Sequence, residues 1–171
     1  LMLQIPELTT ERLLLRCFKP DDFEAYAEMM ADPDVTRHLG LGKPLSRADA
    51  WRQMAMLIGH WALRGYGVWA VEERATGRFL GRIGCMHQEG FPAFEIAYTL
   101  GPWAWSKGYA REGAAAALRF AREVIQYPEI TSIIRPANAA SIRVATSLGA
   151  VPGETVEFFG APSVLYRYPK A

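Results

Sequence analysis

A short loop between an apolar strand pattern and an alanine-rich helix pattern constrains this chain most. Residues 94–100 alternate apolar with other side chains and predict a β-strand, while residues 110–126 carry apolar residues at helical spacing. The loop between them ends in Trp105-Ser106-Lys107-Gly108-Tyr109-Ala110. A strand, a glycine-containing loop and a helix N-terminus, in that order, aim several backbone N–H groups at one point. This order predicts an anion site, with phosphate as the usual anion.

Two commoner phosphate motifs do not fit this loop. A Walker loop requires Gly-x-x-x-x-Gly-Lys-Ser/Thr, whereas Lys107 precedes its glycine and Tyr109 follows it. Residues 65–70 match the letters of a dinucleotide fingerprint, Gly-x-Gly-x-x-Gly/Ala. However, they leave a predicted helix and enter a predicted strand, which is the reverse of the context that dinucleotide binding requires.

The loop instead resembles the Arg/Gln-x-x-Gly-x-Gly/Ala loop of the GNAT superfamily of acetyl-CoA-dependent N-acetyltransferases. Gly108 and Ala110 fill the two small positions, and Trp105 stands where most of the superfamily has Arg or Gln. The Trp-x-Lys-Gly-Tyr-Ala form is similar to the branch that contains the ribosomal-protein N-terminal (alanine/serine) acetyltransferases. Ala97 stands where this branch usually carries glycine, and this difference would alter a local bulge in the strand. The resemblance covers nearly the whole chain, through residues 10–16, 32–35, 95–98 and 138–141.

Bulk properties limit the class of protein. At 171 residues the chain is long enough for a sizeable core, so we expect a single domain over residues 1–171. The formal net charge of +1 gives no basic footprint of the kind that nucleic-acid binding needs. There is no run of about 18 apolar residues and no basic-then-apolar leader, so we expect neither a membrane span nor a secretory signal. Cys17 and Cys85 fall on separate predicted strands, which is typical of reduced thiols in a cytoplasmic protein.

Hydrophobic periodicity divides the chain into helices and strands. Apolar residues at helical spacing predict helices over residues 20–31, 46–64, 110–126 and 138–148. Short or alternating apolar runs predict strands over residues 12–16, 68–73, 79–87, 91–100, 130–134, 155–159 and 163–168. The expected fold class is α/β (α+β), with a mixed, largely antiparallel sheet of about six or seven strands flanked by about four helices.

The resemblance implies acetyl-CoA as the acetyl donor. Its pyrophosphate would rest on the N–H groups of residues 106–111, with the helix dipole behind them. Lys107 or Arg111 would add charge, or would simply point into solvent. The pantetheine arm would pair with a splayed strand as an extra strand does, and the Tyr98 N–H would face the thioester carbonyl. The candidate cofactor-binding residues are Tyr98, Thr99, Leu100, Trp105, Ser106, Lys107, Gly108, Tyr109, Ala110, Arg111 and Asn138.

Glu95 is the candidate general base, because it is the nearest carboxylate on the strand ahead of the loop. Strand alternation puts Glu95 on one face with Ala97 and Thr99. A glutamate inside a central strand is costly unless it is solvated or paired, which marks it as a site candidate. The alternative is a structural ion pair with Arg82.

Ser141 is the candidate proton donor to the departing thiolate, on the strength of the family's Asn-x-x-Ser pattern at Asn138. The resemblance places both near the cofactor. The structural alternatives are that Asn138 is an ordinary helix N-cap and that Ser141 is simply tolerated in the first helical turn. Tyr98 and Tyr109 are weaker alternatives as the acid.

The remaining reactive residues predict neither a metal nor a covalent intermediate. His38, His60 and His87 lack metal-ligand spacing. His87, at the end of a strand, is either a further candidate base or an exposed residue. Neither cysteine follows a nucleophile signature, so we expect the amine to attack directly in a ternary complex.

Two functions stay open at this point. The first is an N-acetyltransferase whose acceptor is a protein or peptide N-terminal amine, or a small-molecule amine. An α-amino group, with a pKa of about 8, is easier to deprotonate than a lysine-like amine near 10.4. The alternative is a non-catalytic acyl-CoA-binding sensor, which Ala97 leaves open and which the joint presence of Glu95, Asn138 and Ser141 disfavours. Dimerisation is common in such folds, and the sequence does not decide whether this chain forms a homodimer.

Overall fold

One sheet of eight strands runs through residues 3–171, the part of the chain that the computed structural model describes. The strand order is β1-β2-β3-β4-β5-β6-β8-β7, and every neighbouring pair is antiparallel except the parallel pair β5 and β6. The strands are β1 (Leu8–Thr9), β2 (Leu13–Arg16), β3 (Val68–Glu73), β4 (Phe79–Met86), β5 (Glu95–Leu100), β6 (Thr131–Ile134), β7 (Val151–Phe158) and β8 (Ala161–Arg167). The predicted mixed, largely antiparallel class is confirmed.

Helices cover both faces of this sheet. Within the described residues they are α1 (Phe23–Ala31), α2 (Pro33–Thr36), α3 (Arg47–Arg64), α4 (Tyr109–Phe120) and α5 (Ala139–Ser147). Buried side chains of α1 and α3 pack with Val68 and Ala70 of β3, whereas those of α4 pack in a cluster with Trp69 and Val71. Successive side chains of a strand point to opposite faces, so α1 and α3 cover one face and α4 covers the other.

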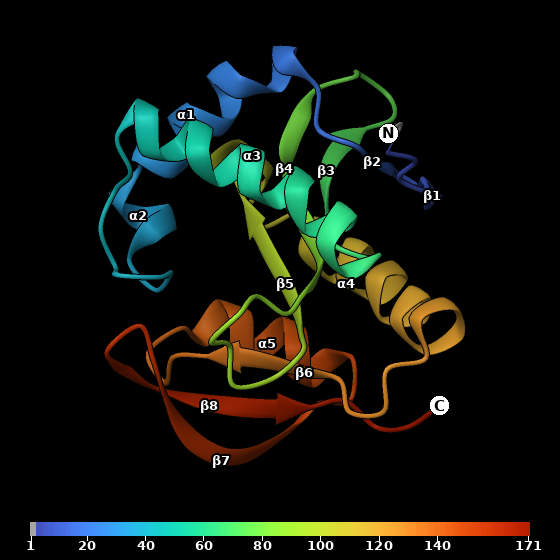
Figure 1. The fold of residues 1–171 in the computed structure, drawn as a ribbon, viewed down its shortest axis with the longest axis vertical. Coiled ribbons are helices and arrows are strands. Elements are labelled where there is room, and N and C mark those ends of the chain that lie inside the picture. The colour runs from blue at the N-terminus through green and yellow to red at the C-terminus, as the bar shows by residue number, and fades with distance from the viewer. Residues whose placement is uncertain (1–2) are drawn as a thin grey trace.

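The sheet divides along the C-terminal half of β5. On one side β5 pairs with β4 from Gly81↔Leu100 to Met86↔Glu95 without a register shift. On the other side it pairs with β6 at one position, Glu95↔Thr131. Figure 1 shows the result: β5 runs between a half that holds β1 to β4 and a half that holds β6, β7, β8 and α5. Beyond Glu95, the β6-facing edge of β5 therefore has no further main-chain pairing with β6, and past Ile96 this edge is open.

Local sequence explains the helix ends. The Ser46 side chain accepts a hydrogen bond from the Asp49 N–H at 3.1 Å and caps α3. Gly65 ends α3 in the left-handed conformation with φ of 78°. Pro20 opens a 3-10 turn that leads into α1.

Several element boundaries differ from those predicted. The strand expected from residue 91 begins at Glu95, because residues 92 and 93 form a bend and Pro92 has no N–H to offer a ladder. The helix expected over residues 110–126 is α-helical to Phe120 and then forms a π-helical segment, Ala121–Ile125. β7 begins at Val151 rather than at residue 155. The extra elements β1 and α2 hold two and four residues, too few to show a period.

Candidate functional site

The N-terminus of α4 presents backbone donors that no side chain satisfies. Gly108 is the N-cap residue, with φ of 80°, and no side-chain hydrogen bond caps this helix within the described residues. Ser106, two residues earlier, is also left-handed, with φ of 59°. The first N–H groups of a helix have no partner inside the helix, and alternating handedness near them turns neighbouring amides toward one point. The predicted strand–loop–helix arrangement is thus present with its donors free.

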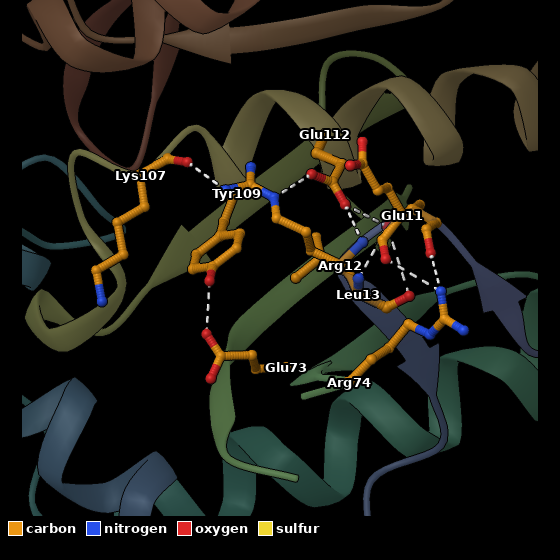
Figure 2. Close-up of polar contacts among 9 residues, drawn as sticks. Glu11, Arg12, Leu13, Glu73, Arg74, Lys107, Tyr109 and Glu112 are labelled. Atoms are coloured by element: carbon orange, nitrogen blue, oxygen red, sulfur yellow. Dashed lines mark hydrogen bonds and ion pairs between the residues drawn. The ribbon is translucent and has the colours of Figure 1, made fainter. Parts of the chain in front are cut away.

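Arg12 of the N-terminal segment holds this loop in place (Figure 2). Its Nη1 donates to the Lys107 carbonyl at 2.8 Å, and its Nε donates to Glu112 Oε1 at 2.7 Å. The guanidinium carbon lies 4.3 Å from the centroid of the Tyr109 ring. Burial opposes ionisation of Glu112, but hydrogen bonds from Thr10 and Arg12 keep its pKa below the usual value. Arg12 therefore joins the first turn of α4, through Glu112, to the loop before it, through the Lys107 carbonyl.

Tyr109 is held at the same place by a second contact. Its hydroxyl donates to Glu73 Oε2 at 2.5 Å, and this hydrogen bond raises the pKa of the phenol. The hydroxyl is therefore committed to β3. This arrangement gives the tyrosine a structural reason to occupy the loop.

A cavity of about 690 Å³ opens over the α4 N-terminus, and we call it the loop cavity. Of the predicted cofactor-binding residues, Lys107 is absent from its lining, and its Nζ instead lies 3.3 Å from the Trp103 carbonyl. The Trp105 indole lines the cavity and donates to the Leu100 carbonyl at 2.9 Å, which ties the loop to the end of β5. The other predicted residues that line it are Tyr98, Thr99, Leu100, Ser106, Gly108, Tyr109, Ala110, Arg111 and Asn138.

A second cavity, of about 460 Å³, lies on the α1 and α3 side of β5, and we call it the helix-side cavity. Glu95 lines it, together with residues of α3, β4 and the β7–β8 hairpin. The two cavities share six lining residues: His38, Leu39, Tyr98, Thr99, Asn138 and Ser141. They therefore meet at the open edge of β5.

The backbone of β5 leaves a donor at this meeting point. The Phe94 carbonyl accepts from the Thr131 N–H at 3.2 Å, and the Ile96 carbonyl accepts from Ser132 Oγ at 2.6 Å. The N–H and C=O of one residue point to the same side of a strand, and this side alternates along the chain. The N–H of Tyr98, two residues beyond Ile96, therefore points into the gap from which β6 has diverged.

Glu95 lies at the point where β5 and β6 separate. It is 9% exposed, and its Oε2 accepts the Ile133 N–H at 3.2 Å. Burial raises the pKa of this carboxyl to about 7, against the opposing effects of the Ile133 N–H and the Arg82 charge. No ion pair joins Glu95 to Arg82 within residues 3–171, so the structural alternative weighed from the sequence is not formed.

Tyr98 and Ser141 form a hydroxyl pair at the junction of the cavities. Tyr98 Oη donates to the Ser141 carbonyl at 2.8 Å, and Ser141 Oγ donates to Tyr98 Oη at 3.1 Å. Burial raises the pKa of Tyr98 to about 12. Asn138 Oδ1 accepts from the Ser141 N–H at 3.3 Å, so Asn138 does cap α5 as well as line both cavities.

The histidines fall into two groups. His38 lines both cavities, and burial together with the nearby Arg37 and Arg135 lowers its pKa; sequence reasoning gave it no role. His60 is buried between the Tyr66 carbonyl and the His87 N–H, at 2.7 and 3.1 Å from its ring nitrogens. His87 lines neither cavity.

Two further features are missing from residues 3–171. No group of three or more His, Cys, Asp or Glu residues in this range is placed to hold a metal ion. No helix there is both long enough and apolar enough to cross a membrane.

Comparison with known proteins points to one family. A family model described as an acetyltransferase (GNAT) domain matches residues 12–151. The chain is 32% identical over 169 residues to the uncharacterized protein YkkB of Bacillus subtilis (strain 168), covering 94% of each. A solved acetyltransferase from Agrobacterium tumefaciens (strain C58) matches at 32% identity with a TM-score of 0.88, covering 99% of this chain and 98% of that one. The ribosomal-protein-S5-alanine acetyltransferase of Vibrio fischeri shares the fold, at 16% identity and a TM-score of 0.70, covering 95% of this chain and 96% of that one.

Proposed function

This chain belongs to the GNAT family of acetyltransferases, and we propose that it transfers an acetyl group from acetyl-CoA directly to a primary amine. The acceptor is a peptide or protein N-terminus or a small-molecule amine, and the reaction proceeds in a ternary complex without a covalent enzyme intermediate. We further propose that residues 1–171 act as one domain and that the two free cysteines suit a reducing cytoplasm.

The uncapped N-terminus of α4 is the observation that carries this proposal. Its donors open into the loop cavity, and the fit to a diphosphate is good because backbone N–H groups and a helix dipole bind such anions without side-chain charge. Ser106, Gly108, Tyr109, Ala110 and Arg111 would hold the pyrophosphate. The open edge of β5 from Tyr98 to Leu100 would pair with the amides of the pantetheine arm.

Acetyl-CoA, when bound, supplies the acetyl group as a thioester. Glu95, with its pKa near 7, takes the proton that the amine loses as the new N–C bond forms. The Tyr98 N–H stabilises the negative charge that develops on the carbonyl oxygen. The Tyr98–Ser141 hydroxyl pair returns a proton to the sulfur as the C–S bond breaks. Asn138 positions Ser141 through the α5 cap.

The test is thiol release from acetyl-CoA with a panel of amines and short peptides, with the acetylated product identified by mass spectrometry. We expect release that depends on both substrates, and a linear dependence on enzyme concentration. Tight acetyl-CoA binding without release for any amine would instead identify a non-catalytic sensor. No acetyl-CoA binding at all would remove the loop cavity from the proposal.

A further inference from the structure

Arg82 of β4 is a buried arginine that forms no ion pair within residues 3–171. Its exposed fraction is 7%, and its Nε is buried with no hydrogen-bond partner. Arg16 offers a direct comparison at the same exposed fraction. Its guanidinium binds both carboxylate oxygens of Asp22 at 2.9 Å and Glu72 Oε2 at 2.6 Å. Because a buried charge is costly unless it is paired, Arg82 is the exception that requires a reason.

Arg82 also lines the helix-side cavity, on the same face of the sheet as Glu95. In the β4–β5 register Arg82 stands opposite Thr99, and Glu95 stands opposite Met86. Four residues separate Thr99 from Glu95, which places the two positions roughly 13 Å apart along the sheet. The small side chain of Ala97 lies between them. Arg82 and Glu95 thus occupy the two ends of one face.

A second donor lies in the same cavity. The Tyr26 hydroxyl donates to Gln53 Oε1, which leaves the Gln53 amide NH2 free to donate. Gln53 lines the helix-side cavity together with Arg82. The Tyr26 hydroxyl also faces Arg82, whose charge and side-chain hydrogen bond oppose the rise that burial causes in the pKa of that phenol. The Arg82 end of the cavity therefore holds donors.

No acid of this cavity forms an ion pair with Arg82 within residues 3–171, although the charges of Arg82 and Glu95 interact at longer range. Asp49 is paired with Arg52 at 2.7 Å, and Glu95 accepts the Ile133 N–H. The other charged lining residues, Lys43 and Arg135, are cationic. An ammonium group that entered alone would meet repulsion, whereas an anionic group beside it would bring compensation to Arg82.

We propose that Arg82, with the Gln53 amide, binds a carboxylate carried by the acceptor, so that the substrate is an amine with an anionic group several bonds away. This inference rests on the proposed amine acetylation. The planar fork of arginine matches the two oxygens of a carboxylate, and the pair is well protected from solvent. The carboxylate belongs either to an amino acid or to an acidic side chain near a peptide N-terminus, since both offer the same chemistry.

The experiment compares ω-amino acids of four to six carbons with their ω-amino amides, which keep the amine and remove the anion. We expect wild type to favour the carboxylate by about 10- to 100-fold in kcat/KM at the best chain length. In Arg82→Met the ratio should fall close to one, and Arg82→Lys should give an intermediate value because it keeps the charge without the fork. A parallel pair of peptides beginning Ser-Glu and Ser-Gln tests the peptide source.

Arg122→Met is the matched control, because Arg122 is the other arginine whose buried Nε lacks a partner in residues 3–171, and it lies outside both cavities. This variant should keep the wild-type ratio. Equal kcat/KM for acid and amide in wild type, or a preference that survives in Arg82→Met, would overturn the inference and leave acetyl transfer intact. A guanidinium that merely holds a water molecule would give that equal result.

A binding measurement separates this inference from the proposed function. N-acetyl-6-aminohexanoate, a product analogue, should raise the melting temperature of the CoA-saturated wild-type protein more than its neutral amide does. Arg82→Met should lose this difference. If no amine is acetylated, the proposed reaction fails, while this comparison still decides whether Arg82 binds a carboxylate.

Discussion

The loop cavity and the helix-side cavity meet at β5 but are built from different material. The loop cavity is formed by backbone: an uncapped helix N-terminus, two left-handed residues and the open edge of a strand. The helix-side cavity is formed by side chains, and two of them, Glu95 and Arg82, are ionisable groups buried with little compensation. Backbone donors serve any molecule that carries the same phosphate and amide groups. Buried side-chain charges select one molecule among many, at a cost in stability.

Replacing Glu95 by Gln should give the largest effect, because it removes the base without changing the shape of the cavity. We expect kcat to fall about 100-fold or more. With a carboxyl pKa of about 7, the wild-type rate should rise as pH increases through 7, since only the ionised form accepts a proton. The variant should lack this step. Rates at several pH values with one amine measure both effects.

Glu89→Gln is the control, since the Glu89 side chain is fully exposed and pairs only loosely with Arg64, at 3.8 Å. It should match wild type at every pH. Equal rates for Glu95→Gln and wild type across the range would remove Glu95 from the reaction.

Glu95→Gln should also stabilise the fold at high pH, because it removes a buried charge from the helix-side cavity. Burial raises the folded-state pKa of Glu95 from 4.5 to about 7, so its favourable contribution is present below 4.5 and is lost as pH rises through 7. Glutamine stays neutral and still accepts the Ile133 N–H. At about pH 8 the variant should be more stable by about 3 kcal/mol at most, with little difference at about pH 4.5. Urea unfolding at both pH values checks the sign, and a variant less stable than wild type at pH 8 would contradict it.

On the loop side, Gly108→Val should weaken acetyl-CoA binding by about 10- to 100-fold, because a β-branched residue resists φ of 80° and fills the anion site. Gly65→Val is a close control. Gly65 has φ of 78° and ψ of 3°, against 80° and 7° for Gly108, and nothing lies near its side-chain position. Calorimetric titration should show affinity lost in the first variant and kept in the second, with a similar loss of stability in both.

Glu112→Gln should give the smallest effect. It removes the charge that Arg12 meets at 2.7 Å but keeps an acceptor, so the loop is held less firmly. We expect a loss of about 1 kcal/mol of stability and an acetyl-CoA affinity lower by about threefold. Glu24→Gln breaks a comparable but exposed pair with Arg47 and should leave affinity unchanged. An affinity loss as large as that of Gly108→Val would mean that side chains, and not backbone, form the loop cavity.

The difference in material explains what could be predicted from sequence. The Gly108 loop is a local pattern, in which strand, glycine and helix follow one another within a few residues. Its geometry could therefore be predicted from the order of residues alone. Glu95 was accessible for a similar reason, since alternation along one strand gives its face. The start of the strand at Glu95 could not be predicted in this way, because the bend before it depends on how Pro92 and its neighbours pack.

Contacts between segments that are distant in the sequence could not be predicted from a local pattern of residues. Arg12 binds the Lys107 carbonyl across 95 residues, and nothing in either segment indicates the other. Arg82 sits in an alternating strand like any polar residue, and its distinguishing property is a buried Nε without a hydrogen-bond partner, which sequence does not display. His38 reaches the junction of the cavities from the segment after α2, where no periodicity applies.

The single pairing position between β5 and β6 has a consequence for the mechanics of the molecule. The two halves of the sheet are joined there by few main-chain bonds, so this seam is the natural place for slow breathing of the fold. A ligand bound along this seam would contact both halves, so its binding free energy would add to the free energy needed to separate them. Amide protons of β6 and β8 would then exchange with solvent more slowly when acetyl-CoA is bound. Their exchange rates would therefore report whether the seam is occupied.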